Sequence, residues 1–152
     1  MRVVTLADGG NIMDYSYALT PFLAWLVAGG LKFAINSVKA GKPAFGLIGY
    51  GGLPSNHSAI VSSIAALIAF KEGIEHPAFG AAAALAFIVV LDASSLRRQI
   101  GRQADAINQL AESQGMSIPQ LRERMGHTLI EIIAGIVTGI LTAAGVHWGM
   151  QI

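Results

Sequence analysis

The 152-residue sequence contains no cysteine, which excludes disulfide bridges and thiolate metal sites. Charge is also scarce, since 12% of the residues are charged, against about 25% in an ordinary soluble domain. No run of basic residues with interleaved aromatic side chains is present, so we do not expect nucleic acid as a partner. Instead, 53% of the chain is hydrophobic and the mean hydropathy is +0.57. This composition indicates a membrane protein; the alternative is a soluble protein with a buried all-helical core.

The hydropathy is concentrated in four stretches bounded by charge, glycine or proline: 15–31, 59–70, 77–91 and 129–150. A spanning helix needs about 20 apolar residues, with about 17 as a lower limit, and only the last stretch reaches that length comfortably. The shorter stretches can still span if their polar ends lie at the interface or line a shielded cavity. We therefore predict an all-α integral membrane bundle of about four transmembrane helices, with an amphipathic polar helical segment between the third and the fourth.

Neither an internal repeat nor a second composition regime is present, so residues 1–152 are expected to form one membrane-embedded domain. Residues 1–15 lack the apolar core and cleavage site of a secretory signal and are interpreted as a short lead-in. Start and stop signals place the four helices at Thr20–Lys39, from Ser55 or Asn56 to about Gly73, Pro77–Ser94, and from about His127.

The polar interfacial segment 92–126 holds half of the basic residues. In its first half, apolar residues recur at helical spacing and predict an amphipathic helix: Leu96, Ile100, Ile107 and Leu110. Residues Ser117–Gln120 resemble a capping box with an early proline, which predicts a short second helix that Gly126 ends in a left-handed cap.

Four spans place the loop after the first helix and the segment 92–126 on the same side of the membrane. His57 and His127 therefore share that side. Most of the basic residues lie there too, and only Arg2 and Lys71 lie on the other side. By the positive-inside rule, we expect a multi-pass protein of the cell (inner) membrane whose candidate site faces the cytoplasm.

His57 follows Pro54, Ser55 and Asn56 at the start of the second helix, in the stretch GGLPSNHSAI. Free N–H groups and the positive end of the helix dipole make such a place suitable for an anion. The serine adds a hydrogen-bond donor, and the histidine adds a titratable proton. The alternative is an ordinary helix cap, for which serine and asparagine are common residues.

His127 and Glu131 are spaced i, i+4 at the start of the fourth helix, so both side chains fall on one face. A carboxylate placed there can bind one imidazole nitrogen and make the other a better nucleophile or base. The alternative is a capping histidine with the glutamate at the interface. Against it, Glu131 lies inside LIEIIAGIVTGI, where an unpaired carboxylate is costly and usually functional.

Arg97 and Arg98 follow the third helix, and guanidinium groups suit phosphate oxygens well. Each of them can equally lie against lipid headgroups. Lys32 interrupts the apolar first helix, so it either extends to the interface or faces the polar site. A stripe of small residues, Gly135, Gly139 and Ala143, indicates close helix packing or a homodimer contact.

Three segments, GGLPSNHSA, LDASSLRRQIGRQADAINQL and MGHTLIEIIAGIVTGIL, together resemble the divergent branch of the type 2 phosphatidic acid phosphatase superfamily, relatives of the acid phosphatases and vanadium haloperoxidases. Pro54, Ser55 and His57 match that superfamily's Pro-Ser-Gly-His motif. His127 and Glu131 match its Arg-x5-His-x3-Asp motif, with glutamate in place of aspartate.

The sequence departs from the superfamily pattern at several positions. Asn56 stands where glycine is usual, and Leu121 stands where the motif has arginine. The leading Lys-x6-Arg-Pro motif is only echoed, by Lys32, Lys39 and the pair Lys42-Pro43. Arg97 and Arg98 are candidates for the missing guanidinium. Since many membrane members have six spans, a second subunit is a candidate to complete the fold.

The resemblance implies a membrane lipid phosphatase that uses neither a metal nor another cofactor. Its substrate would be a lipid phosphate monoester or diphosphate, of the phosphatidylglycerophosphate or phosphatidic acid type. His127, oriented by Glu131, would form a phosphohistidine, and His57 would protonate the leaving oxygen. The phosphate would be held by Ser55, Asn56, Lys32, Arg97 and Arg98. The alternatives are a non-catalytic lipid-phosphate-binding or assembly protein and a small dimeric transporter.

Overall fold

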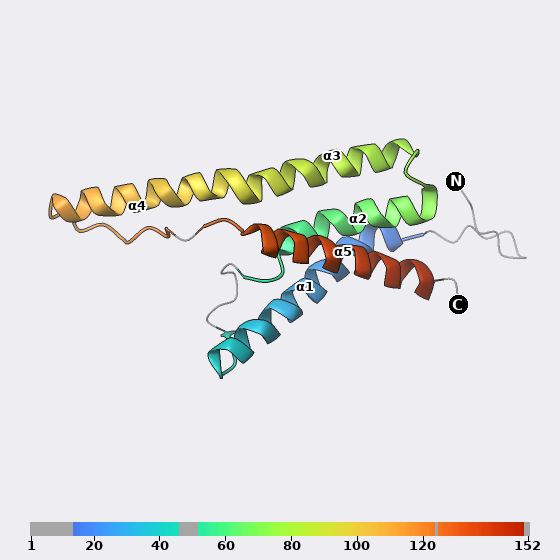
Figure 1. Ribbon diagram of the computed structural model, residues 1–152, viewed down its shortest axis with the longest axis horizontal. Helices are drawn as coiled ribbons and strands as arrows, with labels where there is room; N and C mark the ends of the chain where they lie inside the picture. Colours follow the sequence, from blue (N-terminus) through green and yellow to red (C-terminus); the bar gives the residue numbers. More distant parts are fainter. Residues whose placement is uncertain (1–13, 46–51, 124, 151–152) are drawn as a thin grey trace, which may run out of the picture.

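The computed structural model describes residues 14–45, 52–123 and 125–150, and every regular element in these ranges is a helix. The expected all-α class is therefore confirmed, while most of the lead-in 1–15 lies outside the described residues. In chain order the longer elements are α1 (Ser16–Ala40), α2 (Asn56–Glu72), α3 (Pro77–Leu91), the π-helical turn η2 (Asp92–Leu96), α4 (Arg97–Ser113) and α5 (Leu129–Gly149) (Figure 1).

Four helices, α1, α2, α3 and α5, form the bundle, and α2 lies between the other three. Figure 1 shows α4 continuing the line of α3 beyond the bundle. Among the residues that the structure describes, three helical segments are long and apolar enough to cross a membrane: α1, α5 and the continuous rod Pro77–Ser113. The 17 residues of α2 lie at the lower limit for a span. The predicted helical membrane bundle is confirmed.

The interior of the bundle holds small side chains and its surface holds large apolar ones, whereas a soluble domain buries its large apolar side chains. The buried positions hold mostly small residues, such as Ala24 and Ala28 of α1 and Ala143 of α5, each 0% exposed. Large apolar side chains point outward instead; examples are Phe22 at 67% and Phe87 at 64% exposure. In water such a surface would be strongly unfavourable. The arrangement excludes the soluble alternative and fits a bundle whose outer surface contacts lipid.

The small-residue stripe of α5 packs directly against α2. A Cβ atom on Gly135 would collide with the carbonyl of Ser55 and Cβ of Ser58, and one on Gly139 would collide with Ser62 and Ala59. The stripe is therefore used for close packing within the chain, the first of the two roles expected for it. The homodimer stays a prediction, and α2 already occupies the surface proposed for its contact.

The third helix does not end at Ser94 as expected. It runs on through η2 into α4, and the resulting rod of 37 residues is about 55 Å long at 1.5 Å per residue. The stretch Asp92–Leu96 contains neither glycine nor proline, so only the hydrogen-bond register changes there: the N–H of Arg97 donates to the carbonyl of Asp92, five residues back. The amphipathic helix predicted over the first half of 92–126 is confirmed as α4.

The short helix predicted to open at Ser117–Gln120 is wrong, because residues 116–123 are not helical. This segment returns along α4, and the side chain of Asn108 binds the backbone of Leu121 on both sides, at 2.9 Å for each bond. Gly101 of α4 lies against the carbonyl of Glu123, with no room for a Cβ atom. In a helix, the N–H and the carbonyl of Leu121 would pair within the segment; here both are bound to Asn108 of α4. Gly126 has a positive φ of 93°, but it caps no helix.

Two helix starts also differ from the prediction. The helix α1 begins at Ser16, four residues before Thr20, and Pro21 is tolerated inside its second turn. Asp14 holds this start by accepting from the N–H of Ser16 at 3.0 Å and from Nζ of Lys71 at 2.6 Å. The helix α5 begins at Leu129 rather than at His127, because Thr128 is its N-cap.

The close packing of α5 on α2 predicts opposite effects for two matched substitutions. Gly139→Ala should destabilise the bundle by about 1–3 kcal/mol, since the new methyl group has no space. Gly145→Ala on the same helix, where nothing lies within 4 Å, should be neutral or stabilise by about 0.5–1 kcal/mol. Thermal unfolding in detergent, followed by the fluorescence of Trp25 and Trp148, measures both. Equal transition temperatures for the two variants would contradict the packing.

Candidate functional site

Three parts of the chain meet at one end of the bundle: the start of α2, the residues before α5, and the junction between α3 and α4 (Figure 1). The rings of His57 and His127 lie there with their centroids 6.1 Å apart. The two rings are thus close enough for one small anion beside them to contact both. The two histidines therefore lie on one side of the bundle, as the four-span topology predicts.

His127 is bound to Glu131 by its Nδ1 atom, 3.2 Å from Oε2 of the carboxylate. The same oxygen accepts the N–H of Thr128 at 2.9 Å, and the Thr128 hydroxyl accepts the N–H of Glu131 at 3.3 Å. This reciprocal pair is a capping box, which fixes the carboxylate at the first turn of α5. Because Nδ1 of His127 keeps its proton and donates it to this carboxylate, Nε2 carries a free lone pair.

The backbone of His127 is held as firmly as its side chain. Its N–H donates to the carbonyl of Ala93 at 3.0 Å, within the π-helical turn that shifts the hydrogen-bond register of the α3–α4 rod. The residue is 8% exposed. Burial lowers the pKa of His127 below the ordinary imidazole value, although the hydrogen bond to Glu131 and the charge of its carboxylate act in the opposite direction. His127 is therefore neutral at pH 7.

Arg97 links the α3–α4 rod to His57. Its Nη2 atom donates to Nε2 of His57 at 3.2 Å, so the imidazole carries its proton on Nδ1 in this arrangement. Asp92 lies 3.8 Å from Nε of Arg97. The side chains of this ion pair are 37% and 43% exposed, so the carboxylate contributes little binding energy and mainly limits the directions that the guanidinium can take.

Ser55 is the N-cap of α2 and is completely buried. Its Oγ accepts from the N–H and the hydroxyl of Ser58, at 3.3 and 3.0 Å, and its own N–H donates to the carbonyl of Glu131 at 2.9 Å. The ordinary helix cap expected as an alternative is thus present. Ser55 also ties the start of α2 to the first turn of α5, which positions both histidines.

Two buried polar atoms beside this cap have no hydrogen-bond partner among the described residues: Oδ1 of Asn56 and Nδ1 of His57. Leaving a buried polar atom unpaired costs about 1–3 kcal/mol. Both atoms lie in the first turn of α2, where backbone N–H groups are also unpaired within the helix. The unpaired N–H groups of this turn suit a negatively charged ligand, whereas Oδ1 of Asn56 accepts hydrogen bonds and needs a donor.

Lys32 and Arg98, the other two predicted site residues, have different surroundings. Lys32 is half-buried in α1 and interacts electrostatically with Glu131 and with both histidines. Of its two expected orientations, the one towards the polar site is observed. Arg98 is exposed, its Nε donates to the carbonyl of Ser94 on its own helix, and its side chain lies against Gly126. No contact among the described residues joins Arg98 to either histidine.

Sequence reasoning missed two parts of the site. Thr128 could have been found, because Thr-x-x-Glu before an apolar run is the pattern of a capping box. The carbonyl of Ala93 and the π-helical turn around it have no comparable sequence signal. As for metals, the described residues contain no group of three His, Asp or Glu side chains that could hold an ion.

Comparisons with known proteins show which family this chain is similar to. Residues 13–142 match the family described as the divergent PAP2 family, and this range contains every candidate site residue. A relative from Bacillus subtilis (strain 168), named uncharacterized membrane protein YuiD, is 31% identical over 139 residues, which cover 81% of this chain and 88% of the relative. No solved structure matches the chain. The extent of the family match leads to one conclusion: this chain belongs to the divergent PAP2 family.

Proposed function

We propose that this protein is a membrane lipid phosphatase that hydrolyses a phosphate monoester or diphosphate of a lipid through a phosphohistidine intermediate. The observation that carries the proposal is the pair His57 and His127, whose rings lie 6.1 Å apart, with His127 bound to a carboxylate. One histidine can then attack phosphorus while the other serves the leaving oxygen.

His127 is the proposed nucleophile. Because its Nδ1 donates to Glu131, the lone pair of Nε2 is free to attack phosphorus, and the bond from phosphorus to the lipid oxygen breaks. The carboxylate then stabilises the positive charge that develops on the ring. Since burial lowers the pKa of His127, the neutral, nucleophilic form predominates at pH 7.

His57 is the proposed acid, and Arg97 controls its proton. In the arrangement without phosphate, Arg97 donates to Nε2 of His57 and disfavours the protonated ring. A bound phosphate dianion would draw the guanidinium onto its own oxygens, and its charge would favour a proton on Nε2. His57 then protonates the leaving oxygen, and afterwards it takes a proton from the water that cleaves the phosphohistidine.

The remaining charges of the phosphate are assigned to groups that already surround the space between the rings. Arg97 and Lys32 supply positive charge, and the Nδ2 amide of Asn56 and the N–H groups of the first turn of α2 supply hydrogen-bond donors. Such preorganised donors usually provide much of the rate of phosphoryl transfer. Ser55 acts by holding α2 to α5, and Arg98 is left to interact with headgroups at the membrane surface.

The position of the site at one end of an apolar bundle supports an amphiphilic substrate. Most of the basic residues in the described ranges belong to parts of the chain on this side, namely the end of α1, the helix α4 and the segment 116–123, whereas Lys71 belongs to the last turn of α2 at the other end. We therefore place the site at the cytoplasmic face of the cell membrane. Phosphatidylglycerophosphate and phosphatidic acid are substrates of the required type on that face.

Replacing the nucleophile should abolish turnover. In His127→Asn we expect phosphate release from vesicles containing phosphatidic acid or phosphatidylglycerophosphate to fall roughly a thousandfold or more. His76→Asn is the matched control, because His76 only caps α3 at the opposite end of the bundle through its Nδ1 atom, and asparagine can cap a helix as well. Equal rates for the two variants, or no release by the wild type from either lipid, would refute the phosphatase and favour the non-catalytic alternative.

The pH dependence of kcat/KM tests the pairing of His127 with Glu131. Activity should fall as the pH drops through the pKa of His127, because the protonated ring has no lone pair, and this acidic limb should lie below about pH 6.5, the ordinary imidazole value. Glu131 raises the pKa of His127, so Glu131→Gln should move the limb to still lower pH and also reduce kcat. A limb that does not move, or moves to higher pH, would disprove the assignment.

A further inference from the structure

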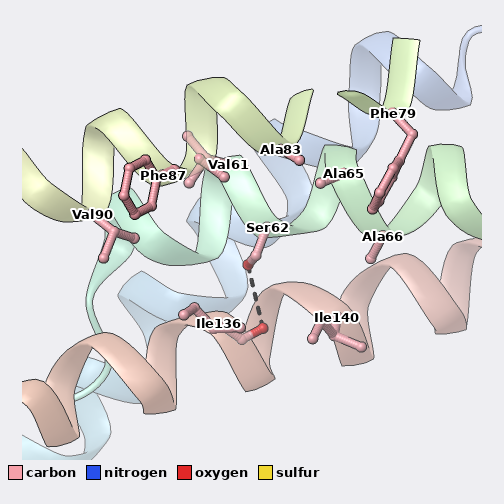
Figure 2. A pocket seen from close by; sticks show the side chains of 11 residues that line it. Val61, Ser62, Ala65, Ala66, Phe79, Ala83, Phe87, Val90, Ile136 and Ile140 are labelled. Atoms are coloured by element: carbon pink, nitrogen blue, oxygen red, sulfur yellow. Dashed lines mark hydrogen bonds between the residues drawn. The ribbon is translucent and has the colours of Figure 1, made fainter. Parts of the chain in front are cut away.

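An apolar groove of about 400 Å³ lies between α2, α3 and α5. Figure 2 shows that α2 and α3 face each other across it, with Ile136 and Ile140 of α5 along its side. The groove exists because α3 packs mainly on α2 and carries small residues, Ala83 and Ala86, where it faces the bundle. Phe79 lies at one end of the groove and Val90 at the other (Figure 2).

The lining offers almost no polar surface to an occupant. Its single polar side chain is Ser62, whose hydroxyl donates to the carbonyl of Ser58 at 2.6 Å and lies 3.3 Å from the carbonyl of Ile136 (Figure 2). That hydroxyl is thus already satisfied by backbone groups. The groove can therefore bind hydrocarbon, and it has nothing to offer a polar ligand.

One end of the groove lies towards the candidate site, because the helices that line the groove also carry residues of the site. Val61 lies one turn of α2 after His57, and Val90 lies seven residues, about two turns, before Arg97 along the α3–α4 rod. On α5, Ile136 lies between one and two turns after Glu131. All three helices thus pass from apolar lining to site residues in the same direction.

We infer that this groove holds one hydrocarbon chain of a lipid whose phosphate lies between His57 and His127. The inference rests on the function proposed above for that site, and it adds that the enzyme selects its substrate by the chain as well as by the phosphate. A phosphate ester on a long hydrocarbon chain would then bind at both places at once, which raises its affinity over that of a phosphate or a lipid chain alone.

The size of the groove favours a single chain over a helix of another protein or of a second copy. From Phe79 to Val90 the groove extends about 16 Å along α3, and a helix 10 Å wide over that length would need roughly 1,200 Å³. Even the whole empty space of the groove, about 840 Å³ with its open side included, is smaller than that volume. A flexible chain without branches fits such a space and leaves α2 and α3 in contact.

Photolabelling in nanodiscs of phosphatidylcholine tests this occupant without requiring turnover. The probes are a phosphatidic acid with a diazirine midway along one acyl chain and a diacylglycerol with the same label but no phosphate. The full chain is used with His127→Asn, so that the phosphatidic acid probe is not converted into the other probe. Trypsin releases α3 within residues 72–97, because no lysine or arginine lies between Lys71 and Arg97, and mass spectrometry measures its labelling.

We expect phosphatidic acid to label this fragment more than diacylglycerol does. Ala83→Leu, which fills the groove, should lower labelling by roughly fivefold or more, whereas Ala84→Leu, one residue away on the exposed side of α3, should not. Ala86→Leu serves as a second groove variant should Ala83→Leu unfold. Equal labelling by both probes, or unchanged labelling in the groove variants, overturns the inference.

Phosphate release by the wild type, measured beside the labelling of His127→Asn, separates this inference from the proposed function. Phosphate-dependent labelling of the groove together with no release by the wild type supports the hydrocarbon site and refutes the phosphatase. Release by the wild type without labelling of the groove refutes the hydrocarbon site and supports the phosphatase. In an active enzyme, Ala83→Leu should raise KM for long-chain phosphatidic acid and leave turnover of a water-soluble short-chain phosphate ester unchanged.

Discussion

The close approach of α5 to α2 is the contact on which the site depends. Gly135 and Gly139 bring the two backbones so near that no Cβ atom fits between them, and the N–H of Ser55 can then reach the carbonyl of Glu131. In a membrane, helices gain little from burying apolar surface against one another, so close packing and hydrogen bonds hold them together. His57 follows Ser55 by two residues and His127 precedes Glu131 by four, so this junction sets the distance between the two rings.

A second constraint comes from the α3–α4 rod, which contributes Arg97 and the carbonyl of Ala93 to the site. The π-helical turn at Asp92–Leu96 shifts the hydrogen-bond register, and the carbonyl of Ala93 accepts the N–H of His127. The same turn sets the rotation of α4 and directs Arg97 towards His57. The segment 116–123, bound along α4 by Asn108, leads the chain back to this turn. The site is therefore assembled from local turns that are each tied to a neighbouring helix.

The sequence predicts those features of the site that depend on residues close together along the chain. The spacing of His127 and Glu131 places both on one helix face, and the Pro-Ser-Asn-His stretch begins a helix because its own Ser55 side chain caps the first turn. The segment Ser117–Gln120 gave the wrong answer for the same reason: its pattern is that of a helix start, but pairing with Asn108 and contact with Gly101 satisfy its backbone instead. A local signal predicts structure only where no distant partner competes for the same groups.

The sequence by itself determined that this chain is an all-helical membrane protein, that its histidines lie at helix starts on one side, and that a stripe of glycines packs closely against something. Only the tertiary structure decided that α2 is the partner of that stripe and that Arg97, not Arg98, reaches His57. Adjacent residues on a helix point about 100° apart, so the choice between the two arginines depends on the rotation of α4 after the π-helical turn. That rotation is fixed by contacts between segments more than 30 residues apart, Ala93 with His127 and Arg97 with His57, which no local spacing encodes.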